Sequence, residues 1–277
     1  MLGMGWGAGT VLNALATGIG CAFGISLRTV CEIDPTSTER VGAQEDIKEE
    51  LVRDLLSLFP GIDSVKFKIE STIPPASGLG SSSAFVNSIL TALNRISENL
   101  DPEDIPEINS KISKKHGISY TGAYDDACAS FYGGLVLTDN ESLKIILRMD
   151  FERYCAILLP PWSKKSIEVA MLRKNNERLH EAVNYVKDGD VGKAMEINSR
   201  FYCERLGYPV KPVELALRYV DEAGLSGNGP AYISLGERED VEKVVALWSD
   251  FGEVIICKTV NTDVFEFLKR GKDMYDG

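Results

Sequence analysis

Hydrophobic residues in the first half of the chain follow two spacings, one typical of strands and one typical of helices. Between residues 65 and 70, apolar and charged residues alternate, which predicts a half-buried strand. Between residues 85 and 100, apolar residues recur every three or four positions, which predicts an amphipathic helix. The elements predicted for this half are, in order, short strands within 10–30 around a turn at Gly18–Gly20 with 22–30 the stronger strand, a helix over 45–58, the strand over 65–70, the helix over 85–100, a short helix over 108–115, and apolar strands over 135–137 and 143–147.

The second half of the chain opens with a change of composition. The apolar run Tyr154–Pro161 predicts a buried strand that is ended by proline. The elements predicted after it are helices over 167–184, 191–205 and 213–222, a strand over 231–235, a helix over 241–250 and a strand over 253–260. This succession is typical of a split β-α-β layer, so we predict an α+β protein with two domains, 1–150 and 151–277.

Charge narrows the classes of ligand that the protein can take. The 277 residues include 30 Lys and Arg against 41 Asp and Glu, for a net charge of −11, and 44% of the residues are hydrophobic. That apolar content is too high for a disordered chain. The acidic balance argues against a nucleic-acid partner, since no basic surplus exists to neutralise phosphates along a duplex. An anionic ligand must therefore be held locally, by backbone N–H groups or by a few well-placed cations.

The N-terminal segment and the cysteines indicate a cytoplasmic protein. Residues 1–27 carry no charge, but a signal peptide needs a basic start and a membrane span needs a more continuous apolar run than this glycine-rich segment offers. We therefore expect no membrane partner. The six cysteines are scattered, without any C-x-x-C pair, and are expected to be reduced and buried.

A glycine- and serine-rich loop between the strand at 65–70 and the helix at 85–100 is the strongest candidate for a functional site. It reads Pro74-Pro75-Ala76-Ser77-Gly78-Leu79-Gly80-Ser81-Ser82-Ser83-Ala84. Glycines let backbone N–H groups approach an anion closely, and the helix that follows directs its unpaired N–H groups and the positive end of its dipole to the same point. The serine hydroxyls can donate to phosphate oxygens or bind Mg²⁺. The alternative is an ordinary serine cap on a strand-to-helix turn; two glycines and three serines together favour phosphate.

Two other phosphate-binding motifs do not fit. No G-x-x-x-x-G-K-[ST] sequence occurs. The glycines of Gly3–Ala8 match a dinucleotide-binding pattern in spacing only, because too few residues precede them to form the strand that such a motif requires. An NAD-dependent enzyme is therefore not expected.

The run Pro74–Ala84, P-x-x-x-G-L-G-S-S-S-A, closely resembles the central ATP-binding motif of the GHMP small-molecule kinases. An Asn-containing segment at Gly9–Asn13 and a late glycine loop at Ser226–Pro230 follow the order of elements in that superfamily. The forms GAGTVLNALATGIGCAFGISL, TGAYDDA and SGNGPA are most similar to archaeal-type shikimate kinases, and the likeness covers nearly the whole chain. The resemblance implies a GHMP-like two-domain fold, with an N-terminal mixed sheet and helices and a C-terminal ferredoxin-like split β-α-β layer.

The resemblance also implies an activity, ATP-dependent phosphorylation of the 3-hydroxyl of shikimate. Gly78, Gly80, Ser81 and Ser82 would hold the phosphates within the ATP-binding run 74–84, and Ser82 is the position that matches the family's Mg²⁺ ligand. The substrate-binding positions that it suggests are Asn13, Gly227 and Gly229. Other members of the superfamily act on homoserine or mevalonate, and a non-catalytic nucleotide-binding protein would keep the same loop; these two alternatives stay open, and oligomeric state is not predicted.

An adjacent pair of carboxylates supplies candidates for the acid–base group of such a reaction. Asp125 and Asp126 lie between small residues and are followed by Gly133-Gly134. Counting back from the double glycine favours Asp126 as the family's catalytic aspartate, whereas counting forward from Gly122 allows Asp125. Two aspartates that merely stabilise a helix N-terminus are the structural alternative.

The family pattern is incomplete at two places. Several relatives carry a metal-binding Glu about eleven residues before the catalytic position, where this chain has Lys114-Lys115; Glu107 is out of register, and Asp125 is a possible substitute. The acceptor's carboxylate also requires a cation, for which the candidates are Arg28, Lys164, Lys165 and Arg173. The sequence does not choose among them.

Overall fold

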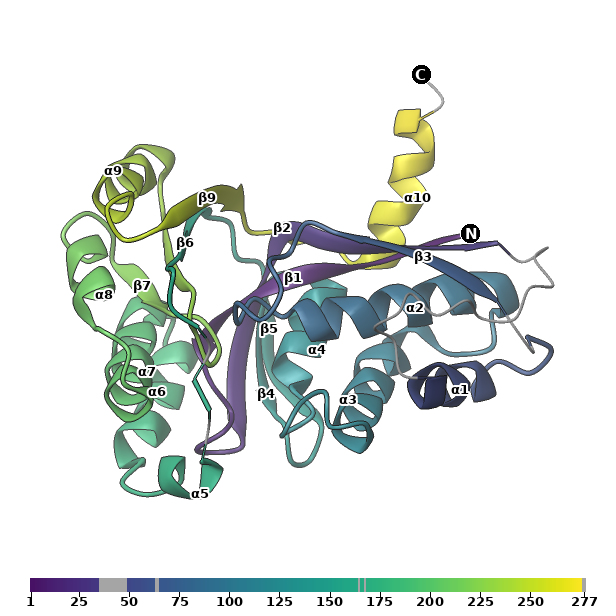
Figure 1. The fold of residues 1–277 in the computed structure, drawn as a ribbon, viewed down its shortest axis with the longest axis horizontal. Coiled ribbons are helices and arrows are strands. Elements are labelled where there is room, and N and C mark those ends of the chain that lie inside the picture. The colour runs from purple at the N-terminus through teal and green to yellow at the C-terminus, as the bar shows by residue number, and fades with distance from the viewer. Residues whose placement is uncertain (35–48, 63–64, 164, 167, 276–277) are drawn as a thin grey trace.

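The computed structural model describes residues 1–34, 49–62, 65–163, 165–166 and 168–275. It contains two sheets, and every strand pair in the described residues is antiparallel (Figure 1). The predicted α+β class is confirmed. The first sheet, however, is antiparallel rather than mixed. Its strands are β1 (Leu2–Leu12), β2 (Ile19–Asp34), β3 (Lys66–Ser71), β4 (Leu135–Asp139) and β5 (Lys144–Met149).

The first sheet is organised around the long hairpin of β1 and β2. The early part of β2 pairs with β4, which in turn pairs with β5, and the late part of β2 pairs with β3. The predicted turn at Gly18–Gly20 lies slightly too late, because the chain reverses over Asn13–Gly18. β1 also begins at Leu2, eight residues before the first predicted strand.

The glycines near the chain start have a packing role. Gly3 and Gly5 lie inside β1, and a Cβ on either would fall within 2.7 Å of the backbone of helix α2 (Ser81–Ser97). Glycine occupies both positions because the backbone of α2 approaches the strand closely. Because Gly3–Ala8 lies inside a strand, it cannot form the strand-to-helix turn of a dinucleotide-binding site, which agrees with the rejection of the dinucleotide-binding motif.

Helices cover both faces of the first sheet. Helices α1 (Glu49–Ser57), α2, α3 (Ile105–Lys115) and α4 (Tyr124–Tyr132) lie on one side, and α10 (Val264–Tyr275) stands on the other (Figure 1). α10 was not predicted. It packs on β1, where Phe267 meets the Trp6 ring edge to face at 4.7 Å, so the end of the chain returns to the first sheet. The first four residues of the predicted helix over 45–58 lie outside the described residues.

The second sheet has the predicted split β-α-β topology. Its strand order, β7-β8-β6-β9, places the first and last strands side by side, as in ferredoxin-like layers. The predicted helix over 167–184 is broken in two, because Asn175 takes a left-handed conformation (φ 50°). Strand β7 was missed at the end of the predicted helix over 213–222. The elements are β6 (Tyr154–Leu159), α5 (Val169–Leu172), α6 (Glu177–Lys187), α7 (Val191–Leu206), α8 (Lys211–Ala216), β7 (Glu222–Leu225), β8 (Tyr232–Gly236), α9 (Arg238–Trp248) and β9 (Glu253–Lys258).

A shared hydrophobic core joins the two sheets. One cluster contains Phe23 and Leu79 from the first half of the chain and Ile157 and Ile233 from the second, all fully buried. A single β-bridge between Ile25 and Thr259 adds a backbone link. The boundary near residue 150 stays a proposal; it falls between β5 and β6, while α10 returns to the first part.

Two further expectations concern the cysteines and membrane insertion. All six cysteines are buried and free, as predicted. In the part of the chain that the structure describes, no helix combines the length and the apolar character needed to cross a bilayer.

Candidate active site

A cavity of about 420 Å³ lies where the two sheets meet. Four segments line it: the end of β1 with the loop into β2, the glycine loop with the start of α2, the end of α3 with the loop into α4 and the start of α4, and the late glycine loop. α5 adds one residue, Val169. The lining residues are Thr10, Asn13, Ala14, Leu15, Ala76, Gly78, Leu79, Gly80, Ser81, Ser82, Ser83, Ser113, Ile118, Ser119, Tyr120, Thr121, Ala123, Asp125, Asp126, Val169, Gly227 and Asn228.

The carbonyl groups of the glycine loop are bonded to neighbouring segments. The Leu79 carbonyl accepts from the Ala8 N–H at 3.0 Å, and the Gly78 carbonyl accepts from the Ser226 hydroxyl at 2.8 Å. Gly78 has a φ of 87°, and a Cβ there would lie 2.3 Å from the Ser226 carbonyl oxygen. Only glycine accommodates both the left-handed backbone and this close approach. The loop is thus held between β1 and the late glycine loop.

The N–H groups at the start of α2 are available to a ligand. The helix begins at Ser81 after Gly80, whose φ is 67°, and no side chain caps it. Within the described chain, the N–H groups of Ser81, Ser82 and Ser83 meet no protein acceptor; the first helical bond runs from Ala84 to the Gly80 carbonyl. Unpaired amides and the positive end of the helix dipole therefore face the cavity together, which suits an anion.

Not every residue of the predicted ATP-binding run lines the cavity. Pro74, Pro75, Ser77 and Ala84 lie outside the lining. Ser77 is buried, and its hydroxyl donates to the Pro74 carbonyl at 2.7 Å, so it shapes the loop. The residues that the structure brings together at the cavity are Ala76, Gly78, Leu79, Gly80, Ser81, Ser82 and Ser83.

The two candidate aspartates occupy different environments at the start of α4. Asp125 is 5% exposed, and its Oδ1 accepts a hydrogen bond from Asn140 Nδ2 at 2.7 Å. Its other oxygen lies against Gly20, where a Cβ would come within 2.3 Å of it. Desolvation by burial raises the pKa of Asp125, and the Asn140 and backbone hydrogen bonds oppose this only in part. Asp126 is only partly buried, and both aspartates line the cavity.

The raised pKa of Asp125 predicts a pH-dependent stability. The folded state keeps the proton of the Asp125 carboxyl group at pH values at which the unfolded chain has lost it. The contribution of Asp125 to stability therefore falls as pH rises above the usual aspartate pKa. Asn at this position has no proton to lose. We expect Asp125→Asn to gain stability over the wild type, with a larger gain at pH 8 than at pH 4. Urea unfolding without nucleotide or metal measures the difference in unfolding free energy between Asp125→Asn and the wild type. A difference that shrinks as pH rises would contradict the burial argument.

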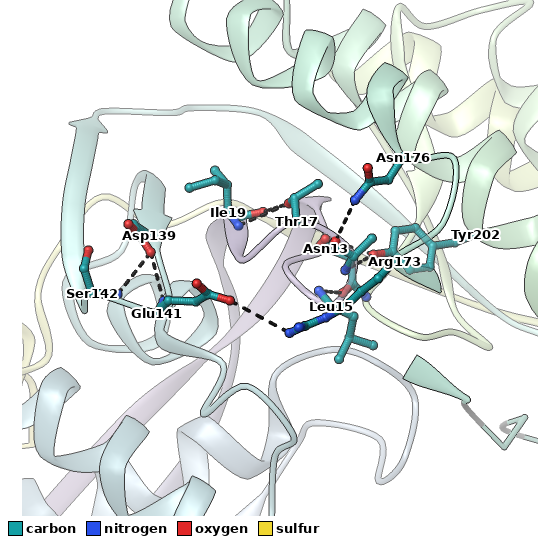
Figure 2. Close-up of polar contacts among 11 residues, drawn as sticks. Asn13, Leu15, Thr17, Ile19, Asp139, Glu141, Ser142, Arg173, Asn176 and Tyr202 are labelled. Carbon is teal, nitrogen blue, oxygen red and sulfur yellow. Dashed lines mark hydrogen bonds and ion pairs between the residues drawn. The ribbon is translucent and has the colours of Figure 1, made fainter. Parts of the chain in front are cut away.

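Asn13 is held by the structure around it as well as lining the cavity. Its Oδ1 accepts from the Leu15 N–H at 2.9 Å, and its Nδ2 donates to Asn228 Oδ1 at 2.7 Å. Its own N–H donates to Asn198 on α7 at 3.0 Å. Tyr202, also on α7, donates to the Asn13 carbonyl at 3.0 Å (Figure 2). Asn13 therefore ties the β1–β2 loop to the second half of the chain.

The late glycine loop contributes one of its two candidate glycines. Gly227 lines the cavity, and its N–H donates to Thr10 Oγ1 at 2.9 Å. Gly229 lies outside the lining, against the Tyr208 ring. The residue between them, Asn228, does line the cavity and was missed. An amide between two glycines in a loop was the available signal.

Of the two acidic residues considered as a second metal ligand, Glu107 is engaged elsewhere, whereas Asp125 lines the cavity. Glu107 pairs with Lys111, and Lys115, at the position of the family's Glu, pairs with Asp54 of α1. Among the residues that the structure describes, no cluster of three or more His, Cys, Asp or Glu side chains is arranged for a metal ion. The cavity lining supplies oxygen donors, among them the serine hydroxyls and the carboxylates of Asp125 and Asp126.

The cations proposed for the acceptor carboxylate lie in different places relative to the cavity. Arg28 lies over the Phe267 ring of α10 at 5.6 Å, and neither Arg28 nor Lys165 belongs to the cavity lining. Lys164 lies outside the described residues. Arg173 follows α5 directly, and Figure 2 shows it pointing toward Glu141 near the β1–β2 loop.

Sequence reasoning missed several other residues at the site. Thr10, Ser113 and the loop 118–121 line the cavity, and Asn140 holds Asp125. Thr10 lies in the Gly9–Asn13 segment and Thr121 in TGAYDDA, but neither was selected as a site residue, and the others stand outside the quoted motifs. Only the packing of α3, α4 and β4 around the cavity brings them together.

Comparisons with known proteins agree with this geometry. Residues 44–134 match the family model described as the GHMP kinases N terminal domain. Shikimate kinase from Archaeoglobus fulgidus is 37% identical over 92% of this chain and 91% of its own. Shikimate kinase from Pyrococcus abyssi is 34% identical over 89% of this chain and 94% of its own.

Solved structures show the same fold at lower identity. The mevalonate kinase of Methanococcus jannaschii superposes with a TM-score of 0.73 over 94% of this chain and 98% of its own, at 14% identity. A putative homoserine kinase from Listeria monocytogenes gives 0.68 over 95% and 98%, at 16% identity. The sequence match at more than 30% identity over nearly the whole length decides the family. The chain belongs to the shikimate kinase family of the GHMP kinases, which are ATP-dependent small-molecule kinases.

Proposed function

We propose that this protein transfers the γ-phosphoryl group of ATP to the 3-hydroxyl of shikimate. One observation carries the proposal: the unpaired amides of Ser81–Ser83 and the carboxylate of Asp126 line the same cavity. Phosphoryl transfer needs positioning and charge neutralisation more than covalent chemistry. A cavity with an anion-binding helix start and a carboxylate meets both needs.

The nucleotide end of the site is the start of α2. Gly78 and Gly80 let the backbone approach the phosphates, and the amides of Ser81 and Ser82 donate to their oxygens. This arrangement neutralises phosphate charge with dipoles, so a protein with a net charge of −11 needs no basic surface for it.

The donor set of the cavity fits Mg²⁺. Mg²⁺ prefers oxygen ligands and is commonly bound by one or two protein groups together with substrate phosphates and water. Ser82, an exposed hydroxyl at the helix start, supplies such an oxygen, and the nucleotide phosphates and water would supply the others. When bound, the ion would neutralise charge that develops on the transferred phosphate. The second ligand common in relatives has no counterpart at Lys115.

Asp126 is the group that we assign to the acceptor hydroxyl. It is more exposed than Asp125, so it has better access to a substrate in the cavity. It would orient the hydroxyl and accept its proton as the bond to phosphorus forms. The buried Asp125, held by Asn140, would fix the start of α4 and the position of its neighbour.

An assay of ADP release over a panel of alcohols tests the function. With ATP and Mg²⁺, we expect shikimate to be phosphorylated, and homoserine and mevalonate to be poor acceptors. Mass spectrometry and ³¹P NMR would identify shikimate 3-phosphate. Turnover of homoserine or mevalonate in place of shikimate would reassign the acceptor, whereas ATP binding without turnover of any alcohol would indicate a nucleotide-binding protein.

A further inference from the structure

The turn after α5 places an arginine at the edge of the cavity. Val169 of α5 lines the cavity, and the Arg173 N–H donates to the Val169 carbonyl at 3.2 Å, so Arg173 follows one helical turn later. Asn176 anchors the same turn by donating to the Ala16 carbonyl at 2.8 Å. The Arg173 side chain points from this turn toward Glu141 (Figure 2). A segment of the second half of the chain thus meets the β1–β2 loop beside the cavity.

The cavity itself offers no cation to an acidic acceptor. Its lining contains two carboxylates, and no lysine or arginine of the described chain belongs to it. The amides of α2 are committed to the nucleotide in the proposed function. An acceptor that carries a carboxylate therefore needs a positive group at the rim, preferably a guanidinium that can bind both of its oxygens.

The present partner of Arg173 can be exchanged at little cost. Its guanidinium lies 3.9 Å from Glu141 Oε1, and the two side chains are 54% and 74% exposed. An exposed pair of this length contributes little to stability. The backbone of the β4–β5 turn is nevertheless held, because Asp139 Oδ1 accepts from the N–H groups of Glu141 and Ser142 at 2.9 and 3.1 Å. The β4–β5 turn thus places the Glu141 side chain within reach of Arg173.

We propose that Arg173 binds the carboxylate of the acceptor, and that Glu141 holds the guanidinium at the cavity edge until the acceptor replaces it. The inference rests on the proposed function only in requiring an acceptor with a carboxylate. Shikimate, homoserine and mevalonate all carry one. Arg173 is therefore an acceptor-binding residue whichever of them is the substrate.

Two neighbouring cations lie outside the cavity. Arg205 stacks on the Phe201 ring at 3.6 Å and donates to the carbonyls of Lys174 and Asn175. Lys174 lines a separate hollow with Arg205 and is absent from the cavity lining. Lys174, adjacent in sequence and equal in charge, is thus a matched control for Arg173.

Steady-state kinetics with Arg173→Gln test the assignment. Loss of a charge-assisted pair should raise KM for shikimate about 100-fold, while KM for ATP changes less than about twofold. The KM of Arg173→Lys for shikimate should fall between those of the wild type and of Arg173→Gln, because lysine keeps the positive charge but cannot bind both carboxylate oxygens as a guanidinium does. Lys174→Gln should match the wild type. Glu141→Gln removes the competing carboxylate and should lower KM for shikimate about two- to fivefold. Equal shikimate KM in Arg173→Gln and wild type would overturn the proposal.

The carboxamide of shikimate gives a readout that a purely structural role would not change. The wild type should prefer shikimate to this neutral analogue by about 100-fold, and Arg173→Gln should treat the two alike. Preserved discrimination in a variant that still binds ATP would also overturn the assignment. If the wild type does not phosphorylate shikimate, the proposed function fails, and the same comparison is made with the acceptor that it does use. A true acceptor without a carboxylate would refute the role of Arg173 as well.

Discussion

Replacing Asp126 by asparagine is expected to lower kcat for phosphoryl transfer by about 10²–10⁴-fold, the usual contribution of a positioned acid–base group. Asparagine keeps the size of the side chain but cannot accept the proton of the acceptor hydroxyl. Because the amides at the start of α2 are unchanged, binding of ATP should persist. Single-turnover phosphate transfer and titration with a non-hydrolysable ATP analogue separate these two effects.

The neighbouring carboxylate is the control for this variant. Asp125 is buried against Gly20 and bonded to Asn140, so Asp125→Asn should keep kcat within about tenfold of the wild type. The reverse result, a small loss for Asp126→Asn and a large loss for Asp125→Asn, would transfer the role of base to Asp125. Equal and small losses would remove both from the chemistry.

Replacing Gly78 by alanine is expected to damage both stability and nucleotide binding. The φ of 87° strains an alanine, and its Cβ would lie 2.3 Å from the backbone carbonyl oxygen of Ser226. Strain and overpacking together should cost about 2–4 kcal/mol of unfolding free energy. Because the loop is held against the late glycine loop at this point, displacing it moves the amides at the cavity, and KM for ATP should rise about tenfold or more. Urea unfolding and initial-rate kinetics measure the two effects.

Gly189 separates backbone strain from the clash. Its φ is 86°, nearly the same as that of Gly78, but a Cβ there would meet nothing within 4 Å. Gly189→Ala should lose only the strain, about 1–2 kcal/mol, and leave KM for ATP unchanged. If Gly78→Ala is no worse than Gly189→Ala in stability and in KM, the close approach at Ser226 is not important for the site.

The loops that line the cavity are tied to both halves of the chain. Leu79 is tied to β1 through Ala8, and Gly78 is tied to Ser226 of the second half of the chain. Asn13 likewise connects the β1–β2 loop to Asn228 and α7. A change at any of these contacts should therefore alter the binding of nucleotide and acceptor together.

Features set by short stretches of the sequence were predictable. The glycine loop and the helix after it follow from local backbone preference, since glycines allow the bend and apolar spacing sets the helix. The α+β class followed from the order of strands and helices. Asp125 and Asp126 could be selected as a pair because they stand next to one another before a double glycine.

Tertiary contacts decided the rest, because they join residues far apart in the chain. Burial against Gly20 distinguishes Asp125 from Asp126, although the two are adjacent. Asn228 reaches Asn13 across more than 200 positions, and Arg173 meets the turn at Glu141 only because α5 packs beside the β1–β2 loop. The same holds for α10, whose partner strand β1 lies at the other end of the chain. Local preference shapes a loop or a helix, whereas burial, pKa and the partner of a charge depend on which distant segments the folded chain brings into contact.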